Sequence, residues 1–585
     1  MVRTLKDKLF LDKLFLNGYI TESQHQNFKV VEEVIDSGLV SADIIIETLS
    51  QTLHIPILDI ALQKVIILDF SKVSEYSLHG YFICKDLSGG KYFVITNPLL
   101  LENAKIIEKY KEYKIMLIKK LDFYDALEIT FSKFNTQKAL LELGFMNSQA
   151  TARSVNYHAA FVKTFGIILL VGYISNAMFV AINYIIYLSQ TYFKMWLFVD
   201  TSLASSIVRH PQEDMMPKHY PIYSVLIPMY KEEYGVKSIL RSMEKLDYPR
   251  NRLDIKLVVE DDDEISLKIL SMITLPEYVH IIKVPYSKPR TKPKALNYAM
   301  QYIKGEYVVI YDVEDRPDRD QLLKALKAFH NSPDSIICVQ AKLNFYNRYY
   351  NLLSRLFSIE YSILFNFLLP GLDASQMPIP LGGNSNHFRS TAIRKLGLWD
   401  AYNVTEDADL GIRIFIYGYQ TKIIDSYTME ESPTDMINWL HQRARWLKGF
   451  IQTFLVYWGQ KPELKVNLSI SGKIGIYLFL GFSTYSFIIM PWHFLAMCFE
   501  LERSNQFLAE LSWYITLLYM YFTASIIIIN DTNNFKNARL LDWIALLVWP
   551  LYFILHIIAS YKALWEILVR PFAWNKTKHE VSKEE

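Results

Sequence analysis

Apolar and polar positions follow three different patterns along the chain. Residues 1–150 combine short helical and strand patterns with polar turns, as in a small soluble α/β domain. Between about 215 and 450, short apolar strands alternate with helical patterns, which predicts a largely parallel sheet covered by helices. Long apolar runs lie on both sides of this region. The pattern therefore predicts an α/β domain inserted between transmembrane helices, with a small N-terminal α/β domain in front.

Two segments of the first domain, 14–21 and 34–41, share one pattern at a distance of twenty residues. Each ends an apolar helix, places a Gly suited to a left-handed cap, and opens the next helix with Thr21 or Ser41. The repeated unit is a helix, a Gly turn and a helix. Further along, residues 92–98 have the composition of a strand that ends in a turn.

The first long apolar run carries no charged residue from 165 to 188, which exceeds the ~20 residues that cross a bilayer. A second run, 195–208, is broken only by Asp200. An even number of crossings keeps the two soluble domains on one side of the membrane. We therefore expect a transmembrane hairpin over 159–208.

Three further apolar runs, 474–499, 511–530 and 541–565, predict transmembrane and interfacial helices over 451–570. Basic residues follow the last run and favour a cytoplasmic tail at 571–585. Three crossings would place that tail outside. Either one run lies flat in the interface or Pro491 splits the first run in two, and the sequence leaves both arrangements open.

Composition narrows the class of protein. Hydrophobic residues make up 51% of the chain and charged residues 21%, while the mean hydropathy is only +0.10, so the apolar residues are concentrated in segments. A net charge of +2 without a long basic run argues against nucleic acid as a partner. Cys84, Cys338 and Cys498 lie far apart, which predicts buried thiols in a reducing compartment. The N-terminus lacks the apolar core of a secretory signal, so we expect the first domain in the cytoplasm.

Acidic residues directly follow two strands of the central region. The strand 255–259 runs into Glu260, Asp261 and Asp262, and the strand 307–311 runs into Asp312 and Glu314. Ligands of parallel sheets bind beyond the carboxyl ends of the strands, where these carboxylates would meet. Oxygen donors suit Mg²⁺ or Mn²⁺, either of which can bridge the phosphates of a nucleotide.

Seven short motifs occur in one order across about 230 residues. They are Pro228-Met229-Tyr230-Lys231-Glu232, the acidic run 260–264, Thr291-Lys292-Pro293-Lys294-Ala295-Leu296-Asn297, Asp312-x-Glu314, Gly382-Gly383-Asn384-Ser385-Asn386, Thr405-Glu406-Asp407, and Gln442-Arg443-Ala444-Arg445-Trp446. In this order they resemble the family 2 glycosyltransferases, and among them the processive, cellulose-synthase-like bacterial subgroup. The resemblance implies a nucleotide-diphospho-sugar transferase domain of the GT-A type.

The resemblance also implies roles for individual residues. Substrate contacts would come from Tyr230, Glu232, Glu260, Asp261 and Asp262 toward the nucleoside, from Lys292 and Lys294 toward the phosphates, and from Asn386, Gln442, Arg445 and Trp446 toward the diphosphate and the acceptor. Asp312 and Glu314 would hold the metal. The family usually has Asp where this chain has Glu314, and Asp315 is the alternative ligand. Asp407, next to Glu406, would be the general base.

We therefore expect an inverting enzyme that transfers a hexose from a UDP-sugar to a growing β-linked polysaccharide, with export through the membrane. It would be a multi-pass protein of the bacterial inner membrane, with the catalytic and N-terminal domains in the cytoplasm. Two alternatives stay open: single transfer to a glycolipid acceptor, and an idle catalytic domain in a membrane scaffold or receptor.

The first domain resembles the N-terminal domain of type II secretion and pilus ATPases, some of whose relatives bind cyclic di-GMP. The nucleotide-binding version begins each repeat with Arg-Leu-Gly, whereas this chain has Leu11-Asp12-Lys13 and Val31-Glu32-Glu33. A docking or structural role is therefore expected, with cyclic di-GMP or a protein as the possible partner.

Overall fold

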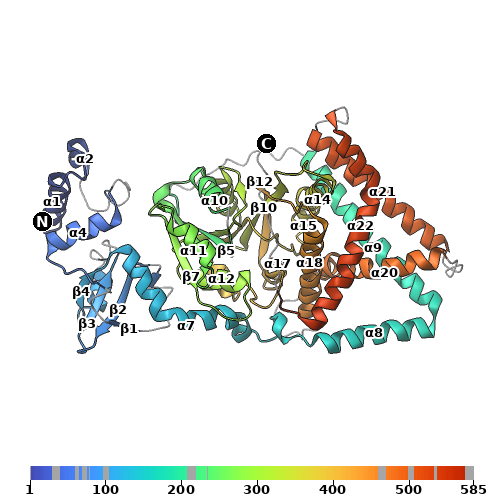
Figure 1. Ribbon diagram of the computed structural model, residues 1–585, viewed down its shortest axis with the longest axis horizontal. Helices are drawn as coiled ribbons and strands as arrows, with labels where there is room; N and C mark the ends of the chain where they lie inside the picture. Colours follow the sequence, from blue (N-terminus) through green and yellow to red (C-terminus); the bar gives the residue numbers. More distant parts are fainter. Residues whose placement is uncertain are drawn as a thin grey trace.

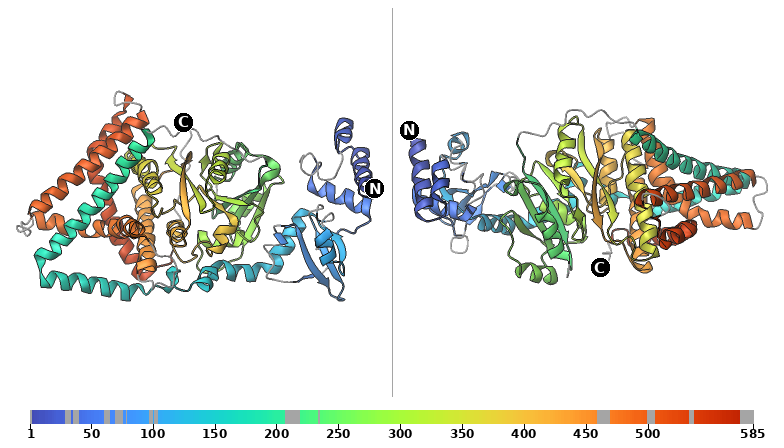
Figure 2. Two further views of the ribbon diagram at one scale, coloured as in Figure 1. Left: turned by 180° about the vertical axis from the view of Figure 1, so that it is seen from behind. Right: turned by 90° about the horizontal axis from the view of Figure 1, so that it is seen from above.

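The protein is elongated in its computed structural model, with the N-terminal domain at one end, the central α/β domain in the middle and long helices at the other end (Figure 1). Views from behind and from above show the same order (Figure 2). The structure describes residues 2–28, 34, 40–59, 65–68, 76–77, 79–96, 100, 104–206, 219–232, 235–458, 469–498, 506–532 and 537–573.

The N-terminal domain packs helices against a four-stranded sheet of order β1-β2-β3-β4, in which β3 and β4 run parallel. Its elements are α1 (Val2–Leu16), α2 (Glu22–Asn27), α4 (Ala42–Leu53), β1 (Val65–Ile67), β2 (Tyr81–Asp86), β3 (Lys91–Ile95), α6 (Ala104–Lys109) and β4 (Lys114–Leu117). The first predicted repeat is confirmed, because Gly18 has a φ of +75° and Thr21 and Gln24 form a capping box for α2. Ser41 caps α4, whereas the turn of the second copy at 35–39 lies outside the described residues.

A single long helix, α7 (Lys120–Met146), joins the N-terminal domain to the central domain (Figures 1 and 2). It packs along α12 (Lys292–Ala299), a helix whose side chains are almost all buried. The side-chain amide of Asn297 donates a hydrogen bond of 2.9 Å to the backbone oxygen of Ala139 on α7. Helix α7 therefore covers part of one face of the central domain.

The central sheet has eight strands in the order β7-β6-β5-β8-β11-β10-β12-β9. They are β5 (Tyr223–Met229), β6 (Leu253–Glu260), β7 (Val279–Val284), β8 (Tyr307–Ile310), β9 (Arg316–Pro317), β10 (Ile336–Phe345), β11 (Asn386–Arg389) and β12 (Gln420–Glu430). Strands β5 to β8 are parallel, β10 and β12 are parallel, and β11 runs antiparallel between β8 and β10. The three predicted central strands and the largely parallel sheet are confirmed. Because β5, β6, β8, β10 and β12 all point one way, their carboxyl ends meet at one edge.

Helices cover both faces of this sheet (Figure 1). They are α10 (Gly235–Glu244), α11 (Glu264–Ser271), α12, α13 (Gln321–His330), α16 (Ser390–Lys395) and α17 (Glu406–Ile416). The short η4 (Arg250–Arg252) precedes β6. The free thiols of Cys84 and Cys338 are buried, as predicted, whereas the side chain of Cys498 lies outside the described residues.

The remaining helices lie on the far side of the central domain. They are η3 (Ala152–Ser154), α8 (Tyr157–Ile174), α9 (Asn176–Ser206), α14 (Leu352–Ile363), η5 (Leu364–Leu368), α15 (Leu369–Ala374), α18 (Met436–Trp458), α19 (Ile470–Ile476), η6 (Tyr477–Gly481), α20 (Phe482–Cys498), α21 (Gln506–Thr532) and α22 (Leu540–Val569). By length and composition, five helices within the described ranges can cross a membrane: Tyr157–Ile174, Leu352–Ala374, Ile470–Leu495, Phe507–Thr532 and Leu540–Val569.

Two details of the predicted membrane segments are wrong. The uncharged run 165–188 is not one helix, because α8 ends before Ser175, whose backbone is extended, and α9 starts in a new direction. The predicted second segment, 195–208, lies largely within the continuous α9. Pro491 lies inside α20 without splitting it. The three C-terminal runs do form long apolar helices, as predicted.

Buried ion pairs connect α14 to the last two helices, α21 and α22. The guanidinium of Arg355, which is fully buried, lies 2.6 Å from the carboxylate of Asp542 and 2.7 Å from that of Asp531. Asp542 is fully buried as well. These charges can stay in the interior because each has a partner in hydrogen-bonding geometry.

Replacing Arg355 with Ala leaves the two carboxylates without their cation in a buried place. We expect this to lower the free energy of unfolding by about 3 kcal/mol or more. The midpoint of thermal unfolding in detergent measures the effect. The matched control is Lys111→Ala, which breaks the exposed Lys111–Glu108 pair of 2.7 Å and should change stability by less than about 0.5 kcal/mol. Equal shifts for both variants would contradict the assignment.

Candidate active site

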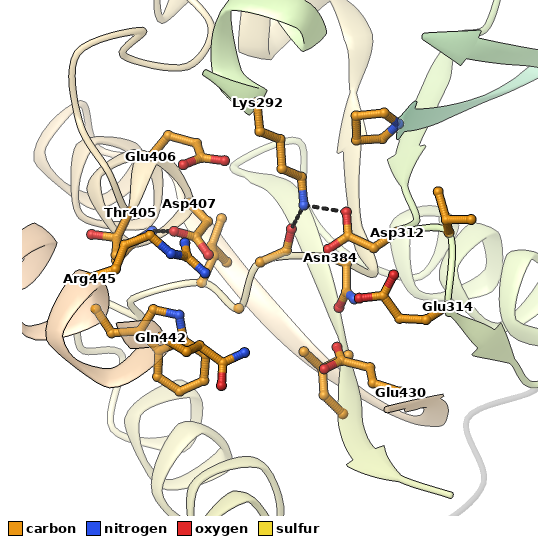
Figure 3. A pocket seen from close by; sticks show the side chains of 18 of the residues that line it. Lys292, Asp312, Glu314, Asn384, Thr405, Glu406, Asp407, Glu430, Gln442 and Arg445 are labelled. Atoms are coloured by element: carbon orange, nitrogen blue, oxygen red, sulfur yellow. Dashed lines mark hydrogen bonds and ion pairs between the residues drawn. The ribbon is translucent and has the colours of Figure 1, made fainter. Parts of the chain in front are cut away.

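A cavity of about 390 Å³ opens at the carboxyl edge of the central sheet, between the sheet and α18. Eleven of the fifteen predicted site residues line it: Tyr230, Glu232, Glu260, Lys292, Asp312, Glu314, Glu406, Asp407, Gln442, Arg445 and Trp446. They come from the ends of β5, β6 and β8, the starts of α12 and α17, and one face of α18. Residues up to 216 positions apart, from 230 to 446, thus meet around one space (Figure 3).

Lys292 lies at the centre of the carboxylates that line this cavity (Figure 3). Its Nζ atom is 2.6 Å from Oδ1 of Asp312 and donates a hydrogen bond of 2.8 Å to the backbone oxygen of Gly383. Burial opposes the charge of Lys292, but Asp312, Glu406 and Asp407 outweigh it and raise the pKa of the ammonium. Lys292 therefore stays protonated, paired with Asp312 on one side of the cavity and within the electrostatic influence of Glu406 and Asp407 on the other.

The second lysine of α12, Lys294, lies beneath the cavity and does not line it. Its Nζ atom is 2.8 Å from Oε2 of Glu260, and both side chains are buried. Asp261 and Asp262, which follow Glu260, are exposed and lie outside the lining as well. Asp262 forms an ion pair with Arg290, whose guanidinium also donates to the hydroxyl of Tyr230 and lies over its ring. Arg290 is a cavity residue that the sequence interpretation missed.

Asp315 is held in the protein interior. It is 1% exposed, accepts 2.8 Å hydrogen bonds from the backbone N–H of Asp312 and the side-chain amide of Asn384, and does not line the cavity. It therefore shapes the loop that carries Asp312 and Glu314. Asn384, which does line the cavity, takes the place expected for Asn386, whose buried amide donates to the backbone oxygen of Gly382.

Two further carboxylates line the cavity at the end of β12, Glu430 and Glu431. Burial, together with the charges of Glu314 and Asp312, raises the pKa of Glu430 to about 8, although a hydrogen bond from Asn384 opposes the shift. The sequence interpretation missed both residues. Two adjacent acids directly after a strand were the available signal, the same signal that identified Asp312.

Glu406 and Asp407 begin α17 on the opposite side of the cavity from Glu430 (Figure 3). Burial, and next the charge of Asp407, raises the pKa of Glu406 to about 7. Burial also raises the pKa of Asp407, against the backbone N–H of Ala408 at 2.8 Å and the charges of Lys292 and Arg445. The two acids therefore share a site that favours one proton between them near neutral pH.

Helix α18 supports this acidic pair through close backbone contact. A Cβ atom added to Gly449 would lie 2.1 Å from Oγ1 and 2.7 Å from Cβ of Thr405, the residue before Glu406. The side chain of Gln452 accepts a hydrogen bond of 3.1 Å from the backbone N–H of Val404. Gly at position 449 therefore lets the loop that carries Glu406 and Asp407 lie directly on the helix.

The same helix presents Gln442, Arg445 and Trp446 to the cavity. Arg445 points toward Asp407 (Figure 3). The indole of Trp446 packs between Phe357 and Tyr361, with ring centroids at 5.9 and 5.8 Å. The guanidinium of Arg443 lies 4.6 Å from the Trp446 ring and 2.6 Å from the carboxylate of Glu360. These contacts fix the orientation of an aromatic surface beside the carboxylates.

The donor set fits a divalent cation in chemistry but does not form a complete metal site by itself. Asp312, Glu314 and Glu430 supply oxygen atoms, which Mg²⁺ and Mn²⁺ prefer, and burial together with the charges of Glu314 and Asp312 raises the pKa of Glu430. Among the residues that the structure describes, no three His, Cys, Asp or Glu side chains are grouped closely enough to hold a metal ion. Further ligands would have to come from a bound diphosphate.

Residues 307–565 match the family described as glycosyl transferase family group 2. The curated relatives include "Probable glycosyltransferase YdaM" of Bacillus subtilis, 27% identical over 63% of this chain and 86% of its own length. They also include a beta-monoglucosyldiacylglycerol synthase of Trichormus variabilis (25% identical, 43% of this chain) and probable glucomannan 4-beta-mannosyltransferase 15 of Arabidopsis thaliana (26% identical, 41% of this chain). The chain spans about half the length of these last two relatives, 53% and 46%.

Among solved structures, the chain is similar to a mannosyltransferase from Pyrobaculum calidifontis in complex with GDP-Man and Mn²⁺, with a TM-score of 0.43 and 17% identity over 66% of this chain and 99% of the other. The family match and the curated relatives show that the chain is a glycosyltransferase, and residues 307–565 are similar to glycosyl transferase family group 2.

Substituting Gly449 with Ala tests the contact between α18 and the acidic pair. We expect sugar transfer to fall by about 10-fold or more, because the new methyl group pushes Thr405 and the adjacent Glu406 and Asp407 out of position. Initial rates of nucleotide release measure the loss. Gly166→Ala is the matched control, since a Cβ atom on this residue of α8 meets no atom within 4 Å. Full activity of the Gly449 variant would refute the role of the contact.

Proposed function

We propose that the protein is an inverting hexosyltransferase that transfers a sugar from a UDP-sugar to the non-reducing end of a growing β-linked polysaccharide. The observation that supports this most strongly is one cavity in which Asp312 and Lys292 face Asp407, with Trp446 beside them. A nucleotide diphosphate and an acceptor hydroxyl can therefore be held on opposite sides of one reacting carbon.

On the donor side, the ring of Tyr230 offers a stacking surface for the base, which contributes ~1 to 3 kcal/mol in comparable sites. Glu232 and Glu260 lie beside it for the polar edges of the nucleoside. Asp312 and Glu314, with Glu430 as a further donor, would hold Mg²⁺ or Mn²⁺ against the diphosphate. The metal would supply charge neutralisation for the departing nucleotide. Lys292 adds a fixed cation at the same place.

On the acceptor side, Asp407 removes the proton from the attacking hydroxyl. A single displacement at the anomeric carbon breaks the bond to the diphosphate and inverts the configuration without a covalent intermediate. Trp446 offers its flat face to an acceptor sugar, with Gln442 at its edge and Arg445 beside Asp407. The charge of Arg445 favours the ionised form of Asp407 and is also available to the diphosphate.

The long apolar helices place this reaction at a membrane. We propose that the catalytic and N-terminal domains face the cytoplasm of a bacterium and that the product leaves through the inner membrane. The N-terminal domain is a docking or regulatory domain, with cyclic di-GMP or a protein as its ligand. The relative that makes a glucosyl lipid favours a second acceptor class, a lipid that receives a single sugar and becomes a glycolipid.

Asp407→Asn removes the general base while keeping the size of the side chain. We expect nucleotide release in the presence of Mn²⁺ to fall by roughly 100-fold or more, with donor affinity nearly unchanged. The purified protein should be assayed with a panel of UDP- and GDP-sugars, and donor binding should be measured separately by calorimetry. Asp425→Asn is the control, because Asp425 is exposed on β12. Undiminished turnover in the Asp407 variant would falsify the assignment.

The pH dependence of transfer follows from the raised pKa values of the acidic pair. Asp407 acts only when it is deprotonated, and burial raises its pKa above the ordinary range of an aspartate, so kcat/KM should fall toward acidic pH earlier than it would with an exposed aspartate as the base. Glu406→Gln removes one negative charge and should move this acidic limb to lower pH. A pH–rate profile from 5 to 9 measures both. An acidic limb that stays in the same place in the variant would argue against coupling.

A further inference from the structure

A second cavity, of about 540 Å³, lies beside the catalytic one. We call it the cationic groove. It is lined by Arg153, Tyr286, Lys288, Pro289, Arg290, Tyr402, Phe572 and Ala573. None of these described lining residues is acidic, while three are basic and three are aromatic. Arg290 also lines the catalytic cavity, so the two spaces adjoin at this residue.

The groove is built from rigid parts of the fold. The backbone of Ala152, next to Arg153, donates a 2.6 Å hydrogen bond to the buried carboxylate of Asp400. On the other wall, the buried ammonium of Lys448 donates a 2.9 Å hydrogen bond to the backbone oxygen of Ala573. The segment that contains Ala152 and Arg153 and the segment after α22 are therefore both held in place by hydrogen bonds to buried side chains.

The basic side chains of the groove differ in whether a carboxylate already neutralises them. Arg290 is paired with Asp262. Arg153 lies 5.2 Å above the ring of Tyr402 and donates a weak 3.4 Å hydrogen bond to its hydroxyl, and within the described residues it has no carboxylate partner. Lys288 also lines the groove and is exposed. Arg153 and Lys288 can therefore both turn toward an anion placed between them.

An apolar helix starts at the edge of this groove. Helix α8 begins at Tyr157, four residues after Arg153, and the ring of Tyr157 contacts Phe572 at 6.3 Å. Only 6% of this apolar helix is buried inside the protein, and its exposed side chains include Phe161, Phe165 and Leu169. The helix runs away from the central domain (Figures 1 and 2). A positively charged cavity thus opens at the base of a long surface that requires lipid.

We propose that the cationic groove binds the phosphate of an anionic membrane phospholipid, whose acyl chains lie along α8. The argument for a lipid in preference to a soluble phosphate is the continuity of the groove with α8, because a free anion would gain nothing from the apolar surface. Arg153 and Lys288 hold the phosphate, and Tyr286, Tyr402 and Phe572 contact the glycerol region at the depth where aromatic side chains prefer the interface.

The experiment uses the full-length protein, purified in detergent and stripped of lipid. Native mass spectrometry measures retained lipid after titration with phosphatidylglycerol, with phosphatidylcholine carrying the same acyl chains, or with inorganic phosphate followed by phosphatidylglycerol. We expect phosphatidylglycerol to bind at least about 10-fold more tightly than phosphatidylcholine, and millimolar phosphate to leave its binding unchanged. The double variant Arg153→Gln, Lys288→Gln should weaken phosphatidylglycerol at least about 10-fold.

The matched control removes the same charge elsewhere. Lys237→Gln with Lys268→Gln changes exposed lysines on α10 and α11, which lie at the other end of the central domain (Figure 1). This control should bind phosphatidylglycerol like the unaltered protein. Lys288→Glu serves as a second probe, because it reverses an exposed charge without touching the buried walls and should weaken binding further than Lys288→Gln.

Three outcomes would overturn the proposal: equal lipid retention by the groove variant and the control, equal affinity for the two phospholipids, or displacement of phosphatidylglycerol by inorganic phosphate. The last would assign the groove to a soluble phosphate compound. Lipid retention is measured without sugar transfer, so it does not depend on the proposed catalytic function.

Discussion

Crowding of negative charge at one edge of the central sheet is the constraint on which the rest of the catalytic domain depends. Asp312, Glu314, Glu406, Asp407 and Glu430 all face a single cavity, and charges this close repel one another. Two lysines of α12 partly neutralise this charge: Lys292 pairs with Asp312 within the cavity, and Lys294 pairs with Glu260 below it. The remaining negative charge makes the cavity suited to a divalent cation and a donor with a good leaving group.

The membrane-side helices are part of this arrangement. One face of helix α18 lines the cavity, and another face packs against α22 through the Lys448–Glu566 pair of 3.3 Å and a hydrogen bond from Trp439. Gln452 donates a further hydrogen bond to the backbone oxygen of Pro571, just after α22. The loop with Asp407 rests on α18 at Gly449. The position of Asp407, the proposed general base, thus depends on packing between helices that follow the last strands of the sheet in the sequence.

Much of the fold could be predicted because its signals are local. The buried strands are short apolar runs, and the acids at their ends precede turns, so β5, β6, β8 and the loops after them were found from the sequence. The direction in which a side chain points was harder to predict from the sequence. Asn384 and Asn386 lie two residues apart, yet the first faces the cavity and the second is turned to the backbone of Gly382, because β11 begins at Asn386. Arg290 reaches the cavity from the loop between β7 and α12, and Glu430 reaches it from the end of β12. The break between α8 and α9 at Ser175 carries no charged residue, Pro or Gly that would mark it in the sequence. The apolar helix Leu352–Ala374 was missed because it contains charged residues, whose buried partners cannot be recognised from the sequence.

The amide of Asn297 has a consequence for the architecture as a whole. It donates to Ala139 of α7 and to Trp399, and it accepts from the backbone N–H of Trp399, so one side chain belongs to three segments at once. Asn135 of α7 adds a hydrogen bond of 2.9 Å to Tyr302. The first 150 residues are therefore not an interchangeable module joined by a tether. Their last helix completes the core that holds α12, and recombination that exchanged this domain would have to carry the matching surface of α12 along with it.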